Sequence, residues 1–202
     1  MKLIYKGIFK DMEQLPKGTL PENAVKFNEP NDMKELEATL HIYLAPPLIA
    51  IALAVIAAFL LHGGLRFSFG LWPVLVGLGL SFASLIIHEV LHAICVPWGA
   101  RVELYIAPSK GMLFVHTTAP ISKARFIFMS LFPNILLGWI PLIIWVVVTL
   151  NPVAGTALFI YAITMTLSGC GDYMNSINAW RQMPRGSMQQ LSGFNSYWFM
   201  PQ

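Results

Sequence analysis

The chain has few charged residues and very few acidic residues beyond its first fifth. Only 11% of its 202 residues are charged and 56% are hydrophobic, whereas soluble domains carry roughly 25% charged residues. After residue 40 the only carboxylates are Glu89, Glu103 and Asp172. This scarcity argues against a water-soluble fold. It also draws attention to Glu89 and Asp172, which fall within long apolar runs where an ionisable group is costly and usually functional.

Cysteines are also few, and the first forty residues do not have the pattern of a cleavable leader. The two cysteines, Cys95 and Cys170, both lie in apolar segments, so the sequence does not predict a disulfide framework. Residues 1–40 are polar and lysine-rich and lack the short apolar core of a signal peptide. We therefore expect the first hydrophobic span to remain in the protein as an anchor.

Four apolar stretches approach the roughly 20 residues that a helix needs to cross a bilayer. The sequence thus predicts an all-α membrane protein whose transmembrane domain covers residues 41–182. An irregular N-terminal segment (1–40) precedes it and a C-terminal tail (183–202) follows it. The predicted spans are Ile42–Leu61, Leu71–Trp98, Phe126–Leu150 and Val153–Trp180.

The residues between the second and third spans change period. Apolar residues alternate on both sides of the turn Pro108–Gly111, which predicts a β-hairpin within residues 101–120. If the four helices alternate in direction, nearly all lysines and arginines lie on one side of the membrane and Arg66 alone lies on the other. By the positive-inside rule, we expect both termini and the hairpin to be cytoplasmic in a multi-pass protein of the cell membrane.

The strongest chemical signal is His88-Glu89-Val90-Leu91-His92 in the second span. Residues four apart stack on one helix face, so His88 and His92 can bind one metal ion. Glu89 can then act as general base on a metal-bound water, as in zinc hydrolases. A chance match is uncommon in this composition, and a purely structural role would need several buried hydrogen-bond partners.

Catalytic zinc usually has a third protein ligand, and Asp172 is the leading candidate. His88 to His92 and Asp172 lie at matching depths when each is counted from the outer end of its predicted span. Asp172 follows two glycines, Gly169 and Gly171, which would allow close helix packing or loosen the helix so that the carboxylate turns inward.

Other residues are weaker candidates. His116 or one of the cysteines could replace Asp172 as the third ligand, although a solvated or substrate-side position suits His116 better. Asn175, one turn after Asp172, could support a ligand or contact substrate, although a plain interhelical hydrogen bond is the better explanation. Asn134 follows Pro133, which kinks the third span, and its side chain could satisfy the freed carbonyl or point into the site.

Several of these motifs resemble a family of small bacterial membrane proteins described as putative zincin peptidases. More distantly, the arrangement is similar to site-2 intramembrane metalloproteases, and that likeness extends to His88, Glu89, His92 and Asp172 only. The Asn-Pro-Asp-Gly type setting of the site-2 aspartate is absent here. The family likeness is carried by His88–Ala93, Pro120–Lys123, the run Ser168–Asn175, and the tail segments Gln182–Gly186 and Gln190–Phe194.

Residues and resemblance together predict a zinc peptidase with one Zn²⁺ that cleaves protein or peptide substrates in or at the lipid bilayer. Nucleic acid is not an expected partner. The main alternative is a catalytically silent metal-binding scaffold, against which the intact Glu89 argues, because binding alone does not need a base. A histidine-bound di-iron oxidase would need more ligands at membrane depth than this chain supplies.

Overall fold

The computed structural model describes residues 1–201, and these residues are mostly helical (58%) with seven strands. The chain divides into two compact units. Unit 1 comprises Met1–Thr39, Glu89–Leu131 and the residues from Asp172 onward, and unit 2 comprises Leu40–His88 and Phe132–Gly171. The sequence predicted an all-α fold with one hairpin, whereas the structure also has a third strand beside that hairpin and a second, separate sheet.

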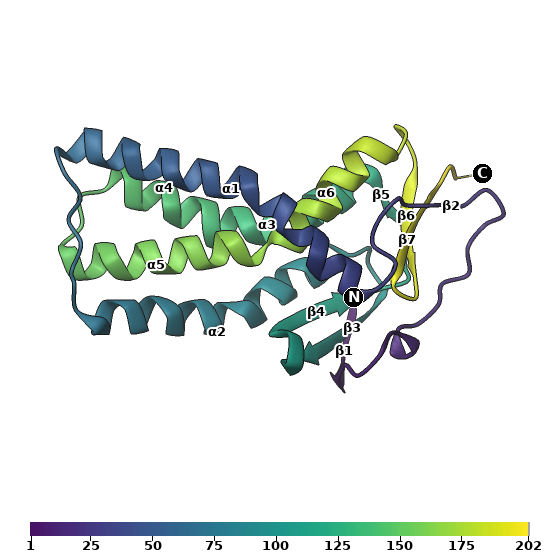
Figure 1. Ribbon diagram of the computed structural model, residues 1–202. Helices are drawn as coiled ribbons and strands as arrows, with labels where there is room; N and C mark the ends of the chain where they lie inside the picture. Colours follow the sequence, from purple (N-terminus) through teal and green to yellow (C-terminus); the bar gives the residue numbers. More distant parts are fainter. Residues whose placement is uncertain (202) are drawn as a thin grey trace. The chain divides into compact units, whose positions relative to one another are not determined.

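Unit 2 is a group of long helices that run alongside one another (Figure 1). It contains most of α1 (Met33–His62), most of α2 (Leu71–Cys95), α4 (Ile140–Val147) and α5 (Pro152–Ser168). Its buried core consists of Ala58, Leu142, Trp145 and Ala162, while many Leu, Ile and Val side chains of the same helices are exposed. Such an outer surface suits lipid rather than water.

Helices α2 and α5 approach each other closely at Gly77. A methyl group added at Gly77 would lie 2.6 Å from the carbonyl oxygen of Ala157 and 2.8 Å from Cβ of Ile160. The small residue therefore allows the two backbones to pack tightly, as is common between helices in membranes.

Three helices are long and apolar enough to cross a membrane. They are α1, α2, and the continuous segment Lys123–Val147, which consists of α3 (Lys123–Asn134), a π-helical stretch (Ile135–Trp139) and α4. The π-helical stretch begins two residues after Pro133, so the predicted irregularity of the third span is present. A proline inside a helix removes one backbone hydrogen bond and favours such a local adjustment.

The predicted fourth span is interrupted. It consists of α5 and α6 (Cys170–Gln182), which are bent by 45° at Gly169, so the region predicted as Val153–Trp180 is a broken helix. If the bent pair is counted as one span, residues 1–201 contain four candidate spans. The sequence allowed for a helix loosened by Gly169 and Gly171, and at the bend Gly169 packs so closely on Asn134 that a side chain there would overlap it.

Unit 1 contains a three-stranded sheet in the order β1-β3-β4. The predicted hairpin is confirmed as β3 (Arg101–Ala107) paired antiparallel with β4 (Met112–His116). The prediction of an irregular N-terminal segment was wrong, because β1 (Lys2–Ile8) pairs in parallel with β3. Most side chains of β1 are exposed, so the strand has no alternating hydrophobic pattern that sequence reasoning could detect.

A second sheet of unit 1 joins segments that are distant in the sequence. Its order is β2-β7-β6-β5, formed by Val25–Lys26, Asn195–Phe199, Met188–Ser192 and Ile121–Ser122. The tail beyond residue 183 is thus a β-hairpin, and Gly193 adopts a positive φ of 61° at its turn. The N-terminal segment is fastened to this turn, since the amide of Gly193 donates to the carbonyl of Pro16 at 3.0 Å.

Candidate metal centre

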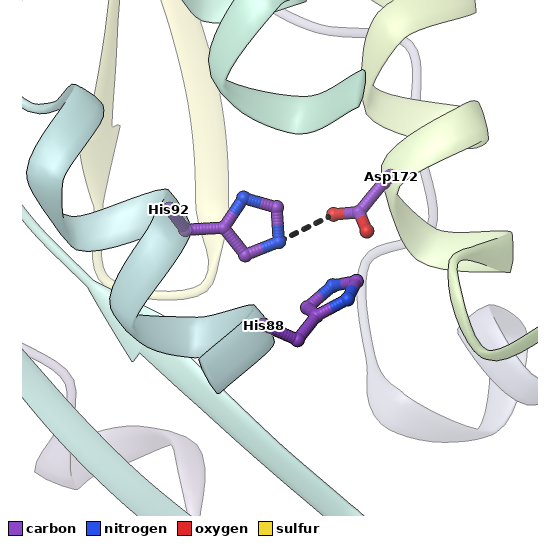
Figure 2. Close-up of side chains that lie close together, drawn as sticks. All are labelled: His88, His92 and Asp172. Carbon is purple, nitrogen blue, oxygen red and sulfur yellow. Dashed lines mark ion pairs between the residues drawn. The ribbon is translucent and has the colours of Figure 1, made fainter. Parts of the chain in front are cut away.

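Two turns near the C-terminal end of α2 present the histidines of the motif. His88 and His92 are four residues apart on α2 and are only 5% and 7% exposed. Asp172, in the first turn of α6, completes a group whose potential ligand atoms all lie within 4.8 Å of one another (Figure 2). The structure therefore brings together the three residues that the sequence singled out as metal ligands.

The geometry of the group fits a zinc ion. His92 Nε2 lies 3.2 Å from Asp172 Oδ1. Donors at about 2.0–2.1 Å from a tetrahedral zinc are about 3.3 Å from each other, so this separation needs almost no adjustment. Two imidazole nitrogens and one carboxylate oxygen form a donor set of the type found in catalytic zinc sites, and a fourth position would stay open.

His92 is oriented by a backbone group on another helix. Its Nδ1 lies 2.8 Å from the carbonyl oxygen of Met129 in α3. A carbonyl only accepts hydrogen bonds, so Nδ1 carries a proton, which makes Nε2, on the side of Asp172, the ring nitrogen that could bind a metal ion. Metal-binding histidines are commonly fixed in this way by a hydrogen bond from the other ring nitrogen.

Glu89 lies between the histidines in the sequence and contacts the edge of the first sheet. It is 8% exposed, and its Oε2 accepts a hydrogen bond of 2.9 Å from the amide of Val115 in β4. The carboxylate is also close enough to His92 and Asp172 to interact electrostatically with both. Because β4 is an edge strand, the contact places Glu89 beside backbone groups that an added strand could use.

Asp172 lies in the first turn of α6, directly after the break between α5 and α6. A Cβ at Gly169 would collide with the side-chain oxygen of Asn134, which is completely buried. The absence of a side chain at position 169 thus lets the α5–α6 junction pack directly against Asn134, three residues before Asp172. The predicted contact of Asn134 with substrate stays a prediction.

The remaining candidates lie outside the cluster. His116 is buried on β4 and its Nε2 bonds to the carbonyl of Gly193 at 2.9 Å, so it is neither solvated nor one of the three grouped residues. Cys95 is buried and Cys170 partly buried, and neither is in a disulfide. Asn175 is half-buried one turn after Asp172. In the part of the chain that the structure describes, His88, His92 and Asp172 form the only group of side chains placed to hold a metal ion.

Sequence reasoning missed the backbone partners of the site. The carbonyl of Met129 and the amide of Val115 belong to every residue type, so no side-chain pattern could have marked them. The only available signal for Val115 was the hairpin itself, whose alternation places one strand at an edge.

Comparisons with known proteins give one match. Neither the curated proteins nor the solved structures contain a significant match to this chain. The model of one protein family, described as "Putative zincin peptidase", matches residues 81–188, which include the histidine motif and Asp172. This match covers more than half of the chain and therefore shows its family. The chain belongs to this family of zincin peptidases.

Proposed function

We propose that this protein is a zinc-dependent peptidase embedded in a membrane, which hydrolyses peptide bonds of membrane or membrane-proximal proteins. The observation that carries the proposal is the grouping of His88, His92 and Asp172 with Glu89 beside them. The family match and the long apolar helices support it independently.

In this proposal each residue has a separate role. His88, His92 and Asp172 would hold the ion, which when bound lowers the pKa of water and polarises the scissile carbonyl. Glu89 accepts the proton of the attacking water and passes it to the leaving amine. The hydrogen bond that His92 Nδ1 donates to the Met129 carbonyl keeps the ring in the tautomer that the ligand set needs.

The edge of β4 is the proposed docking place for substrate. Val115 directs its amide away from β3 towards Glu89, and in an antiparallel pair the alternate residue Leu113 directs its backbone groups to the same side. An extended peptide that pairs with this edge would pass next to Glu89. Strand addition of this kind binds the backbone of a substrate and tolerates varied side chains.

The strand pairings of unit 1 support four crossings with both termini on one side. β1 pairs with β3, so the chain between them, which contains α1 and α2, must cross the membrane an even number of times. β5 pairs with β6, which imposes the same condition on the chain from α3 to α6. Together with the distribution of basic residues, this favours a cytoplasmic position for unit 1.

The likeness to site-2 proteases extends to the two histidines, the glutamate and a later aspartate. We include it in the proposal because helices supply these four residues next to candidate membrane spans. The second candidate function, a silent metal-binding scaffold, leaves the hydrogen bond that positions Glu89 without a purpose.

The deciding experiment compares wild type with Glu89→Gln in cell membranes. We expect new protein N-termini in membranes that contain wild-type protein and their loss with Glu89→Gln, with a rate reduction of about 10²–10⁴. Zinc content should be equal in the two, since the ligands are intact. Glu22→Gln, at an exposed carboxylate, is the matched control. Equal processing by wild type and Glu89→Gln, with zinc retained, supports the scaffold function instead.

A further inference from the structure

Unit 1 contains a polar pocket built from residues other than the metal-ligand group. Its volume is about 390 Å³, at the lower end of the range of about 300–1,000 Å³ for small-molecule sites. The N-terminal segment, the start of β3 and the end of β4 form its walls. Six of its lining residues are Lys6, Gln14, Arg101, Glu103, His116 and Thr117.

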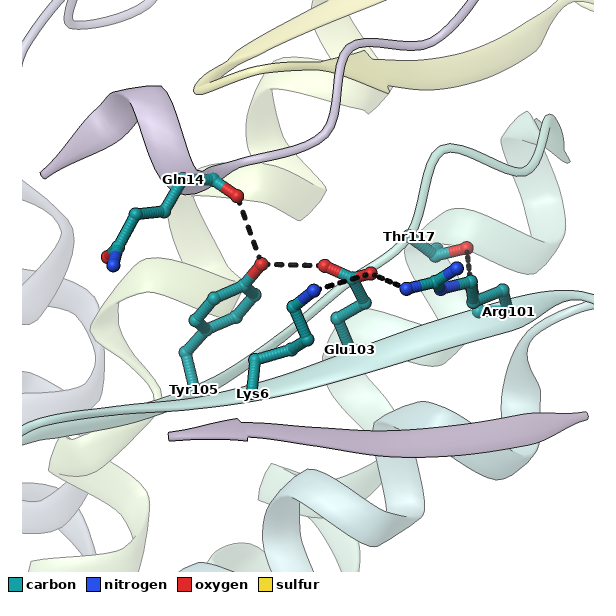
Figure 3. A network of polar contacts seen from close by, with 6 residues as sticks. All are labelled: Lys6, Gln14, Arg101, Glu103, Tyr105 and Thr117. Atoms are coloured by element: carbon teal, nitrogen blue, oxygen red, sulfur yellow. Dashed lines mark hydrogen bonds and ion pairs between the residues drawn. The ribbon is translucent and has the colours of Figure 1, made fainter. Parts of the chain in front are cut away.

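A buried carboxylate organises this pocket. The side chain of Glu103 is 6% exposed, and its Oε2 accepts a hydrogen bond of 2.6 Å from the hydroxyl of Tyr105 (Figure 3). Its Oε1 lies 2.8 Å from Arg101 Nη2 and 3.7 Å from Lys6 Nζ. Burial opposes ionisation, but the Tyr105 hydrogen bond and the two cations together hold the pKa of Glu103 below its ordinary value.

The two cations retain unused hydrogen-bond donors. Their side chains are 37% exposed for Lys6 and 61% exposed for Arg101, and within residues 1–201 Glu103 is the only acceptor that either side chain contacts. An ammonium group has three N–H donors and a guanidinium group has five. The carboxylate is thus satisfied, whereas the cations offer donors and an excess of one positive charge to a ligand.

His116 adds an acceptor to the same pocket. Its Nε2 bonds to the carbonyl of Gly193, so Nε2 carries a proton. Burial lowers the pKa of the ring, which is therefore neutral, and its Nδ1 has no hydrogen-bond partner among the described residues. His116 is only 4% exposed, and a buried acceptor without a partner is costly unless a ligand or ordered water supplies a donor.

We propose that this pocket binds a small phosphate group that carries a neighbouring hydroxyl. Lys6 and Arg101 contact the phosphate oxygens, Glu103 orients the two cations, and the hydroxyl donates to His116. Arginine is well suited to phosphate because its planar fork can donate two parallel hydrogen bonds. The same chemistry occurs in soluble glycerol phosphate and in the headgroup of phosphatidylglycerol.

Binding to the full-length protein in neutral detergent tests the proposal. We expect glycerol 3-phosphate to bind saturably by calorimetry and Arg101→Gln to weaken this binding at least tenfold. Lys6→Gln should weaken it less, because its ammonium makes single rather than paired contacts. Lys110→Gln is the matched control, since Lys110 is on the same hairpin but pairs with Glu37 outside the pocket.

A second arm identifies the source of the phosphate. Phosphatidylglycerol in phosphatidylcholine nanodiscs should raise the unfolding temperature of wild type more than that of Arg101→Gln if the natural ligand is the lipid headgroup. If glycerol 3-phosphate alone shows the Arg101 dependence, the ligand is a soluble phosphate. The proposal fails if neither probe binds saturably, or if Lys110→Gln weakens binding as much as Arg101→Gln does. Thermal unfolding of each variant without ligand shows whether it is folded.

Discussion

The two units differ most in where they place charge. Unit 2 contains no acidic residue and a single basic one, Arg66, whereas all ten acidic residues of the chain belong to unit 1. The boundary between them falls inside α2, between His88 and Glu89. The comparison teaches that one half is an apolar scaffold held by close helix packing, while the other carries all the carboxylates; of the three grouped residues only His88 belongs to the apolar half.

The largest expected effect is a loss of zinc binding when one of the proposed ligands is removed. His92→Ala removes one proposed ligand, and we expect zinc affinity to fall by at least about 100-fold, since even the residues that support ligands contribute 10–100-fold. Zinc content by mass spectrometry and competition with a chelator measure this. His41→Ala, at an exposed histidine, should retain all its zinc. Full zinc occupancy in purified His92→Ala would refute the proposed ligand set.

A second change tests whether the packing of unit 2 positions Asp172. Gly169→Ala places a methyl group on the buried side chain of Asn134, and we expect a loss of about 2–3 kcal/mol in unfolding free energy together with weaker zinc binding. Gly171→Ala is the control, because a methyl group there meets nothing within 4 Å. Unfolding in detergent and zinc titration are the measurements. Similar behaviour of the two alanine variants would mean that the α5–α6 break does not depend on Asn134.

A third change should affect unit 2 without affecting the metal. Gly77→Ala forces α2 away from α5, and we expect a cost of about 1–2 kcal/mol in unfolding free energy with zinc affinity unchanged. Gly79→Ala, on the same helix but with open space at its Cβ, should be neutral or stabilise by up to about 1 kcal/mol. Thermal unfolding in detergent compares the two. A loss of zinc in Gly77→Ala would show that the two units are less separate than their charges indicate.

The smallest expected effect concerns acid sensitivity within unit 1. The folded-state pKa of Glu103 is lowered, so its contribution is present above the unfolded-state pKa of about 4.3 and is lost as pH falls through the folded-state value. Glu103→Gln should therefore cost about 1–2 kcal/mol at neutral pH and little at pH 3. Unfolding free energies at several pH values measure this.

Glu29 is a second glutamate of unit 1, and its pKa is shifted in the opposite direction to that of Glu103. Chiefly through burial its pKa is raised, so its ionisation weakens folding as pH rises, and Glu29→Gln should improve in relative stability from acid to neutral pH. Parallel pH profiles for Glu29→Gln and Glu103→Gln would contradict these opposite assignments.

The sequence predicted the parts of the structure that depend on local patterns. Apolar runs identified α2 and the end of α1, although α1 begins at Met33, nine residues before its predicted start. Alternation around a turn identified the β3–β4 hairpin, and i, i+4 spacing together with equal depth singled out His88, His92 and Asp172. In each case a residue and its near neighbours carried the signal.

What the sequence did not predict depends on contacts between distant segments. Gly169, where the helix bends, packs against Asn134, thirty-five residues earlier, and a glycine in an apolar run is equally compatible with a straight helix. The pairing of β1 with β3 and the hydrogen bond between Val115 and Glu89 use backbone groups, which are the same in every residue. Such contacts follow only from the tertiary fold.

The parallel pairing of β1 with β3 has a consequence for biosynthesis. Residues 2–8 leave the ribosome well before their partner strand, which begins at Arg101, after α1 and α2. The N-terminal strand must therefore wait unpaired while both helices are inserted, and the first sheet can close only after the hairpin is made. Long-range pairing of this kind is slow, so closure of the first sheet should be a late step in the maturation of the newly made protein.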